Sequence, residues 1–282
     1  MKPAPFAYVR AESVDHAVNV LREHGDEAKP LAGGQSLVPA LNMRLARPSV
    51  LVDLNRVGGL DAIAEQNGSI AVGALARQSA VLRANLVRER CPLLTEALGL
   101  VGHVVTRNRG TVGGSIAHAD AAAELPLALA ALGGSIVTSR RVVAANDFFV
   151  AGFVTALEPD ELLLSTSWPT CRAGEGSAFE EFTPRHGDFA LAAAACVLRV
   201  ENGLVAEARV AVNAVTQTPE LVDTARLIGQ AFDDEAAHEV GATAASMVDP
   251  PPNLHGSPAY RRSLVATLVA RAVARAWERA AV

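Results

Sequence analysis

The chain has 282 residues, half of them apolar, with a mean hydropathy of +0.22 and a formal net charge of −5. Its length favours two domains, and its apolar content excludes a disordered chain. The acidic balance, with no basic run interleaved with aromatic residues, excludes nucleic acid as a partner.

Membrane and metal chemistry are not expected of this chain either. Its longest apolar stretch, Leu125 to Val137, is too short to span a bilayer, and no apolar run follows the charged N-terminus, so we expect a cytoplasmic protein. Cys91, Cys171 and Cys196 are far apart and form no CxxC pair or Cys/His cluster. We therefore expect no metal ligands here, whether for an iron–sulfur cluster or for a structural zinc.

The first part of the chain alternates short strands with helices. Ser13 begins an amphipathic helix, and Gly25 lies just past its end. Strands are predicted at 29–32, 50–54, 70–72, 135–138 and 161–169, and further helices at 38–45, 77–89, 93–100 and 122–132. A polar segment at 106–110 is expected to be a loop.

The residue composition changes after Pro169, where a polar, glycine-containing segment indicates a domain boundary. Strands are predicted at 179–182, 193–200 and 205–215, and Asn202-Gly203 indicates a tight hairpin. Helices are predicted at 222–248 and 257–282, separated by three prolines. The expected organisation is an α+β domain at 1–172, followed by a smaller domain at 173–282 with a three-stranded sheet and helices.

Two glycine pairs about eighty residues apart are the most informative motif. Gly33-Gly34 and Gly113-Gly114 each lie between a predicted strand and a predicted helix and are followed by small polar residues. Adjacent glycines permit positive φ and bring backbone N–H groups close to an anion. One pair alone is better explained as an ordinary strand-to-helix turn. Two in one domain favour a clamp on the linked phosphates of a dinucleotide, although neither has the spacing of a Rossmann or P-loop motif.

The residues around the second pair allow more than one interpretation. His118, Asp120 and Glu124 have metal-ligand chemistry, but Asp120 is better explained as a cap at a helix start, and Glu124 could accept hydrogen bonds from a ribose or adenine. Arg107 and Arg109 could neutralise phosphate, face an acidic partner, or be solvated loop residues. No set of acid, base and nucleophile emerges, so no catalytic residue is predicted.

Longer stretches around both glycine pairs resemble a known family. The first is Pro30-Leu31-Ala32-Gly33-Gly34-Gln35-Ser36-Leu37-Val38-Pro39, followed by Val52-Asp53-Leu54-Asn55. The second is Arg107-Asn108-Arg109-Gly110-Thr111-Val112-Gly113-Gly114-Ser115-Ile116-Ala117-His118-Ala119-Asp120. They resemble the two FAD motifs of the medium subunit of molybdenum hydroxylases, the carbon monoxide dehydrogenase and xanthine dehydrogenase flavoprotein family. The resemblance covers essentially the whole chain.

This resemblance implies a vanillyl-alcohol-oxidase-type (PCMH-type) FAD-binding domain, followed by a small C-terminal domain of sheet and helices. The residues that it implies for FAD binding are Ala32, Gly33, Gly34, Gln35, Ser36, Leu37, Thr111, Gly113, Gly114, Ser115, Asp120, Glu124, Leu163 and Phe189. The glycine motifs would surround the pyrophosphate, with Leu163 and Phe189 near the flavin. Some relatives have a lysine near the flavin where this chain has Glu180, so Glu180 is left out of the predicted site.

The resemblance also implies an electron-transfer function. Electrons from a molybdenum cofactor in a large subunit would reach FAD through two [2Fe–2S] clusters of a small subunit and pass to an external acceptor. The expected assembly is a dimer of heterotrimers, and its substrate (carbon monoxide, an N-heterocycle or an aldehyde) is not determined by this chain. Two alternatives stay open: a self-contained flavin-dependent reductase or oxidase of the same fold, and a nucleotide-binding scaffold.

Overall fold

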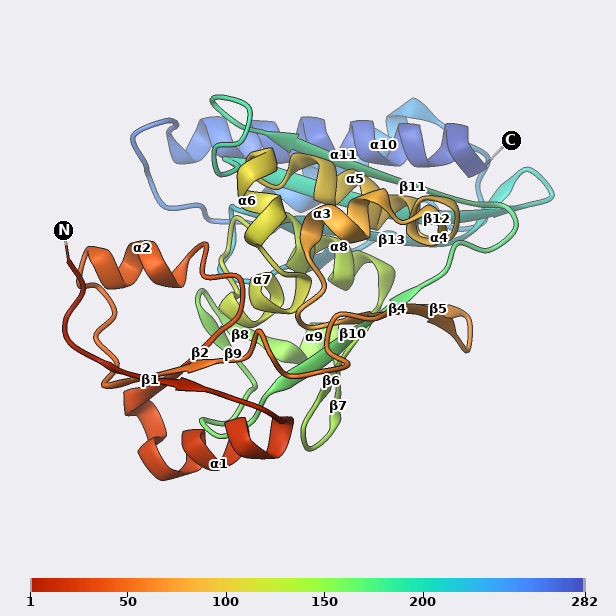
Figure 1. The fold of residues 1–282 in the computed structure, drawn as a ribbon. Helices are drawn as coiled ribbons and strands as arrows, with labels where there is room; N and C mark the ends of the chain where they lie inside the picture. Colours follow the sequence, from red (N-terminus) through yellow and green to blue (C-terminus); the bar gives the residue numbers. More distant parts are fainter. Residues whose placement is uncertain (1, 281–282) are drawn as a thin grey trace.

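The computed structural model describes residues 2–280, and its N-terminal part is a parallel three-stranded sheet with α1 packed on it (Figure 1). The elements here are β1 (Ala7–Arg10), α1 (Val14–His24), the short 3-10 helix η1 (Gly25–Glu27), β2 (Ala28–Leu31), α2 (Leu37–Asn42) and β3 (Val50–Asp53). The Ser13 hydroxyl accepts the His16 N–H at 3.0 Å, and Gly25 takes a φ of +53°, which confirms both predicted ends of α1. β1 has no strand pattern of its own and forms by pairing with β3.

The middle of the chain forms a five-stranded sheet in the order β4-β5-β10-β6-β7, with helices packed against it. Its elements are β4 (Ile63–Gln66), β5 (Ser69–Gly73), α3 (Gln78–Arg83), α4 (Asn85–Arg90), α5 (Pro92–Leu100), α6 (Val104–Arg109), α7 (Val112–His118), α8 (Glu124–Leu132), β6 (Ser135–Thr138), β7 (Val142–Ala144), α9 (Ala145–Phe148), β8 (Phe149–Ala151), β9 (Val154–Thr155) and β10 (Leu163–Pro169). No helix within residues 2–280 is long and apolar enough to cross a membrane.

Two predicted elements in this region are wrong. The helix expected at 77–89 is two helices, because Ala84 is extended, with φ −66° and ψ 120°, and separates α3 from α4. The segment expected to be a polar loop at 106–110 is mostly the helix α6. Arg107, on that helix, is buried and donates to the carbonyl oxygens of Val101 at 2.7 Å and Gly102 at 3.0 Å. Bonds from the buried Arg107 to the segment just before α6 therefore stabilise a helix that the polar sequence does not indicate.

The C-terminal sheet is buried on both faces. It contains β11 (Glu175–Phe182), β12 (Ala192–Glu201), β13 (Leu204–Asn213) and β14 (Glu220–Val222), and is followed by α10 (Asp234–Met247) and α11 (Pro258–Ala280). Alternate side chains of a strand point to opposite faces. Ala193 and Ala195 accordingly join the core that includes residues of α5 and α8, whereas Ala194 and Cys196 join the core beneath α10 and α11, the helices that cover the sheet in Figure 1. The two parts of the chain thus share one core.

This sheet has four strands, not the predicted three. Val222, expected to begin a helix, is instead the last residue of β14 (Glu220–Val222), which pairs with β13. Helix α10 begins only at Asp234, where the Asp233 carboxylate accepts the Glu235 N–H at 3.0 Å. The predicted hairpin is confirmed, since Asn202 and Gly203 take φ values of +52° and +76° between β12 and β13.

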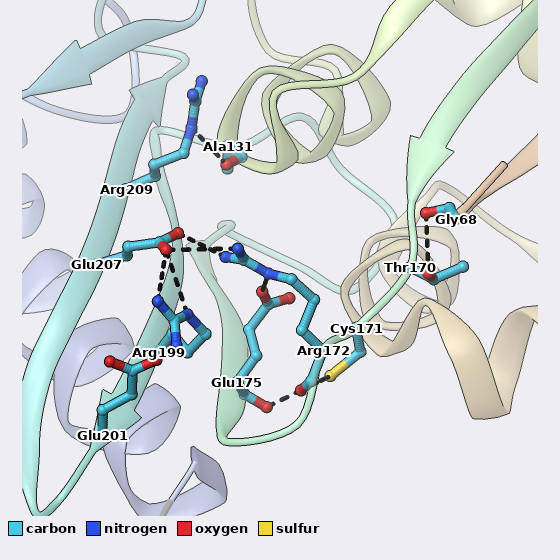
Figure 2. A network of polar contacts seen from close by, with 10 residues as sticks. All are labelled: Gly68, Ala131, Thr170, Cys171, Arg172, Glu175, Arg199, Glu201, Glu207 and Arg209. Carbon is cyan, nitrogen blue, oxygen red and sulfur yellow. Dashed lines mark hydrogen bonds and ion pairs between the residues drawn. The ribbon is translucent and has the colours of Figure 1, made fainter.

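Two sets of polar contacts hold β13 in place (Figure 2). Ion pairs join it to the segment between β10 and β11, and an arginine on β13 caps the C-terminal end of α8. Arg172, between β10 and β11, donates to Glu175 at 2.8 Å and to Glu207 on β13 at 2.6 Å. Farther along β13, Arg209 donates to the Ala131 carbonyl oxygen at 3.1 Å, at the C-terminal end of α8. A cation is favourable there, because the last carbonyls of a helix carry partial negative charge. β13 is therefore held both to the connection and to the N-terminal domain.

Glu161 is a buried carboxylate that fixes the start of β10. It accepts hydrogen bonds from Arg141 at 3.1 Å, from the Thr138 hydroxyl at 2.5 Å and from the Glu158 N–H at 3.1 Å. Burial works to raise the pKa of Glu161, but the bonds from Arg141 and Thr138 outweigh it and lower the pKa to about 2. The anchored segment leads directly into Leu163, the first residue of β10.

We predict that Glu161→Gln lowers the free energy of unfolding by about 2 to 4 kcal/mol at pH 7, because it removes the buried charged acceptor shared by Arg141, Thr138 and the Glu158 N–H. A lowered carboxyl pKa stabilises the fold above the ordinary value of 4.5, and this contribution is lost as the pH falls towards 2. The difference between wild type and variant in urea unfolding should therefore shrink over that range. Glu65→Gln, which breaks an exposed pair with Arg90, is the control and should cost less than about 1 kcal/mol. Equal losses in the two variants would contradict the assignment.

Candidate functional site

Every residue of the predicted site lines one cavity of about 920 Å³. Its walls come from the β2–α2 loop, the start of α7, the segment leading into α8, and residues 187–189 between β11 and β12. Lining it are Ala32, Gly33, Gly34, Gln35, Ser36, Leu37, Thr111, Gly113, Gly114, Ser115, Asp120, Glu124, Leu163 and Phe189. Its volume lies in the range of small-molecule and cofactor sites, roughly 300 to 1,000 Å³. That these residues share one cavity is observed; that each contacts a cofactor stays a prediction.

The first glycine motif presents free backbone N–H groups. Gly34 takes a φ of +72°, and the loop then turns into α2, with the Val38 N–H bonded to the Gly34 carbonyl at 3.0 Å. Among residues 2–280, no acceptor lies within hydrogen-bond reach of the N–H groups of Gly33, Gly34, Gln35 or Ser36. Consecutive free amides in a tight turn form a concavity that suits an anion. The expectation of an anion-binding loop fits this geometry.

The second motif differs from the loop that the sequence predicts, because its glycines lie in the first turn of α7. Thr111 caps this helix by accepting the Gly114 N–H at 3.0 Å, and the Gly113 N–H donates to the Ala74 carbonyl at 3.1 Å. These amides already have protein acceptors. What α7 offers the cavity is its N-terminal end and the hydroxyls of Thr111 and Ser115.

Glycine in both motifs is required by close packing. A Cβ on Gly113 would lie 2.5 Å from the Cα of Ala74 on the neighbouring chain segment. A Cβ on Gly33 would lie 2.4 Å from the Arg109 carbonyl oxygen and 2.9 Å from the Gly110 Cα. No side chain fits at such distances. The two motifs, distant in sequence, are therefore in direct backbone contact at one wall of the cavity.

Carboxyl groups line the cavity at the start of α8. Asp120 accepts the Ala122 N–H at 2.9 Å, so it stabilises the turn before α8 and is not the cap of that helix. Burial raises the pKa of Glu124 to about 8, and burial likewise raises the pKa of nearby Glu181 to about 7. At pH 7 most Glu124 side chains keep their proton, and a protonated carboxyl can both donate and accept a hydrogen bond.

Four other residues considered in the sequence analysis, Arg107, Arg109, His118 and Glu180, are not part of the predicted FAD site. The Arg107 guanidinium is bonded to carbonyl oxygens, and neither Arg107 nor Arg109 lines the cavity. His118 lines the cavity and packs on Phe153, with ring centroids 5.0 Å apart. No metal-binding cluster of His, Cys, Asp or Glu lies among residues 2–280. Glu180 forms an ion pair with Arg275 and does not line the cavity, which supports leaving it out of the site.

Lys29 and Gln78 are among the cavity residues that the predicted site did not include. Lys29 on β2 brings a positive charge, and Gln78, at the start of α3, brings a side-chain amide. Gln78 is only 4% exposed, and its Oε1 has no hydrogen-bond partner within the described part of the chain. Buried polar atoms are nearly always paired, so an unpaired one at a cavity wall indicates a ligand contact. Nothing in the local pattern distinguishes either residue from ordinary surface positions.

Comparison with known proteins identifies an FAD-binding domain and a flavoprotein C-terminal domain over nearly the full chain. Residues 4–171 match the family model described as FAD binding domain in molybdopterin dehydrogenase, and residues 177–276 match the CO dehydrogenase flavoprotein C-terminal domain. The chain belongs to the FAD-binding medium-subunit family of molybdopterin dehydrogenases. Its fold is thus the predicted FAD-binding domain with a small C-terminal domain, and its cofactor is FAD.

Relatives of this flavoprotein are similar along their whole length. The 6-hydroxypseudooxynicotine dehydrogenase complex subunit alpha of Paenarthrobacter nicotinovorans is 41% identical, over 99% of this chain and 97% of that protein. The carbon monoxide dehydrogenase medium chain of Hydrogenophaga pseudoflava is 34% identical, with 100% of both covered. A solved carbon monoxide dehydrogenase structure from that organism superposes with a TM-score of 0.96 at 35% identity, covering 99% of each chain. Quinoline 2-oxidoreductase from Pseudomonas putida 86 gives 0.93 at 35% identity, again covering 99% of each.

The cavity of the flavoprotein fits FAD on its own geometry. Free amides suit a pyrophosphate, the absence of room for a Cβ keeps the two motifs close to each other, and the unpaired Gln78 Oε1 can accept a hydrogen bond from a ligand. Leu163, 6% exposed, supplies an apolar wall, whereas Phe189 is 70% exposed and free to contact a ring. The chemistry of these groups matches a ligand with a charged middle and an aromatic end.

Glu124 gives a pH prediction for the FAD-free protein. The unfolded carboxyl ionises near 4.5 and the folded one near 8, so between these values only the folded state keeps the proton and stability falls as the pH rises. Glu124→Gln cannot ionise. Relative to wild type it should gain up to about 1.4 kcal/mol of unfolding free energy per pH unit across this window.

Urea unfolding at pH 5 and pH 8 measures this gain, with Glu89→Gln on the exposed side of α4 as the matched control. A difference between wild type and Glu124→Gln that does not change with pH would contradict the buried, protonated carboxyl.

Proposed function

We propose that this chain is the electron-transfer subunit of a molybdenum hydroxylase complex and that the glycine motifs hold the FAD pyrophosphate. The observation that carries the proposal is the single cavity in which both motifs meet, with free amides on one side and the end of α7 on the other. FAD supplies a redox centre that accepts electrons from one partner and passes them to another.

Each group of the cavity has a distinct part in this proposal. The amides of Gly33 to Ser36 donate to one side of the pyrophosphate, and the hydroxyls of Thr111 and Ser115 face its other side. Lys29 offsets its negative charge. Leu163 and Phe189 contact the flavin ring, and Glu124 presents a protonated carboxyl to another part of the cofactor. These residues bind, orient and screen the cofactor, and none acts on a substrate.

The partners follow from the family. The relatives are named as the alpha subunit of a dehydrogenase complex, as medium chains and as a medium subunit, and one solved structure is described by its molybdenum cofactor. We infer a small [2Fe–2S] subunit and a large molybdopterin subunit, in a cytoplasmic dimer of heterotrimers. The substrate would contact the large subunit, so this chain does not select it.

Purification of the tagged chain from its own cells tests the function. We expect one FAD per chain, together with a partner that contains iron and acid-labile sulfide and a partner that contains molybdenum. The isolated chain should take up FAD but turn over no substrate. Turnover by the isolated chain, with no iron or molybdenum present, would favour the self-contained flavoenzyme, and a colourless bound nucleotide would favour the scaffold.

The placement of the pyrophosphate gives a separate prediction. Gly33→Ala puts a methyl group against the Arg109 carbonyl and must push the two motifs apart, so the FAD dissociation constant should rise at least about tenfold, or about 1.4 kcal/mol. Gly99→Ala is the control, because a Cβ there meets nothing within 4 Å. Titration of the FAD-free proteins with FAD, followed by flavin fluorescence, measures both. Unchanged affinity in Gly33→Ala would show that the junction of the motifs is not part of the site.

A further inference from the structure

Arg77 connects both glycine motifs without lining the cavity. It is the half-buried N-cap residue of α3, and its guanidinium has two separate acceptors. One terminal nitrogen donates to the Arg109 carbonyl oxygen at 2.5 Å, and the other donates to the Asn55 side-chain oxygen at 2.6 Å. The Arg109 carbonyl is the same atom against which Gly33 packs, so this bond acts at the junction of the two motifs.

Asn55 completes the connection to the first motif. Its side-chain nitrogen donates to the Ala32 carbonyl oxygen at 2.9 Å, directly before Gly33. The Asp53 carboxylate accepts both the Asn55 backbone N–H at 2.9 Å and the Asn55 side-chain N–H at 2.5 Å, and it also accepts the Tyr8 hydroxyl. Asn55 is therefore held in one orientation, with its oxygen directed to Arg77 and its nitrogen to Ala32.

We propose that Arg77 and Asn55 form a latch that sets the spacing of the two glycine motifs and thereby the affinity for FAD. Both are positioning residues, because they act on the cofactor only through the backbones of Ala32 and Arg109. Arginine suits this task since its planar fork presents two N–H groups in fixed and different directions. The latch rests on the proposed placement of the pyrophosphate between the motifs.

The fold does not depend on the latch. The Gln78 N–H still donates to the Gly110 carbonyl at 3.0 Å, and the Val112 N–H still donates to the Ala76 carbonyl at 3.0 Å, so α3 and α7 stay joined without Arg77. The N-terminal core and the shared core are built from apolar side chains elsewhere. Loss of the latch should consequently loosen the motifs while the domain stays folded.

The test compares Arg77→Gln, Arg77→Lys, Asn55→Ala and the double variant Arg77→Gln/Asn55→Ala in the full chain. Arg88→Gln is the matched control, because it removes an arginine-to-asparagine hydrogen bond of the same kind on α4, away from the cavity. Three quantities are measured: the FAD dissociation constant, the melting temperature of the FAD-free protein, and amide hydrogen exchange in the peptides that cover 38–40 and 109–115. The amides of Val38 and Ala40 report on the first motif, because they donate to the carbonyl oxygens of Gly34 and Ser36.

We expect Arg77→Gln to raise the FAD dissociation constant at least tenfold and to speed exchange in both peptides, with a melting temperature like that of Arg88→Gln. Asn55→Ala should weaken FAD binding similarly, and the double variant should be no worse than Arg77→Gln, because both residues belong to one connection. Arg77→Lys keeps the charge but not the fork, so it should restore only part of the affinity.

Several results would overturn the latch: exchange in the two peptides of Arg77→Gln equal to that of Arg88→Gln, full rescue by Arg77→Lys, or additive losses in the double variant. Exchange is measured without FAD and tests the latch by itself. Faster exchange in both peptides with unchanged FAD affinity would instead place the pyrophosphate elsewhere and contradict the proposed site.

Discussion

The close approach of two backbones at Gly33 is the constraint on which the site depends. A glycine there lets the β2–α2 loop lie against the carbonyl of Arg109, so two segments from different ends of the domain form one wall. The amides of Gly33 to Ser36 have no acceptor among residues 2–280, and these residues line the cavity. The junction thus places the proposed anion-binding loop beside the second motif.

The C-terminal sheet supplies the second constraint. Because β12 is buried on both faces, the chain after the connection cannot separate from the N-terminal domain without exposing Ala193, Ala195 and Phe179. The turn that carries Phe189 is joined directly to β12 and is thereby held at the cavity. In the proposed site, this small second domain contributes Phe189 to the part of the cavity where the flavin ring would lie.

Much of the fold and of the candidate site could be predicted from the sequence, because their signals lie within a few neighbouring residues. Capping at Ser13, the hairpin at Asn202-Gly203 and the paired glycines have signals within a few residues, and the resemblance of the long motifs selected the site residues. The elements that the sequence analysis missed depend on side-chain burial, strand pairing or backbone angles that the local pattern does not show. Helix α6 depends on the buried Arg107. β1 and β14 form only by pairing with neighbouring strands. No Gly or Pro marks the break between α3 and α4 at Ala84. Likewise, no pattern shows that the amides of Gly113 and Gly114 are already bonded within the protein, or that Arg77 and Gln78 matter.

A crystal structure of the chain with bound FAD tests the central claim most directly. The account predicts the pyrophosphate within hydrogen-bond distance of the Gly33 to Ser36 amides and of the hydroxyls at the start of α7, with the junction at Gly33 unchanged. A pyrophosphate bound by only one motif, or outside this cavity, would contradict the account.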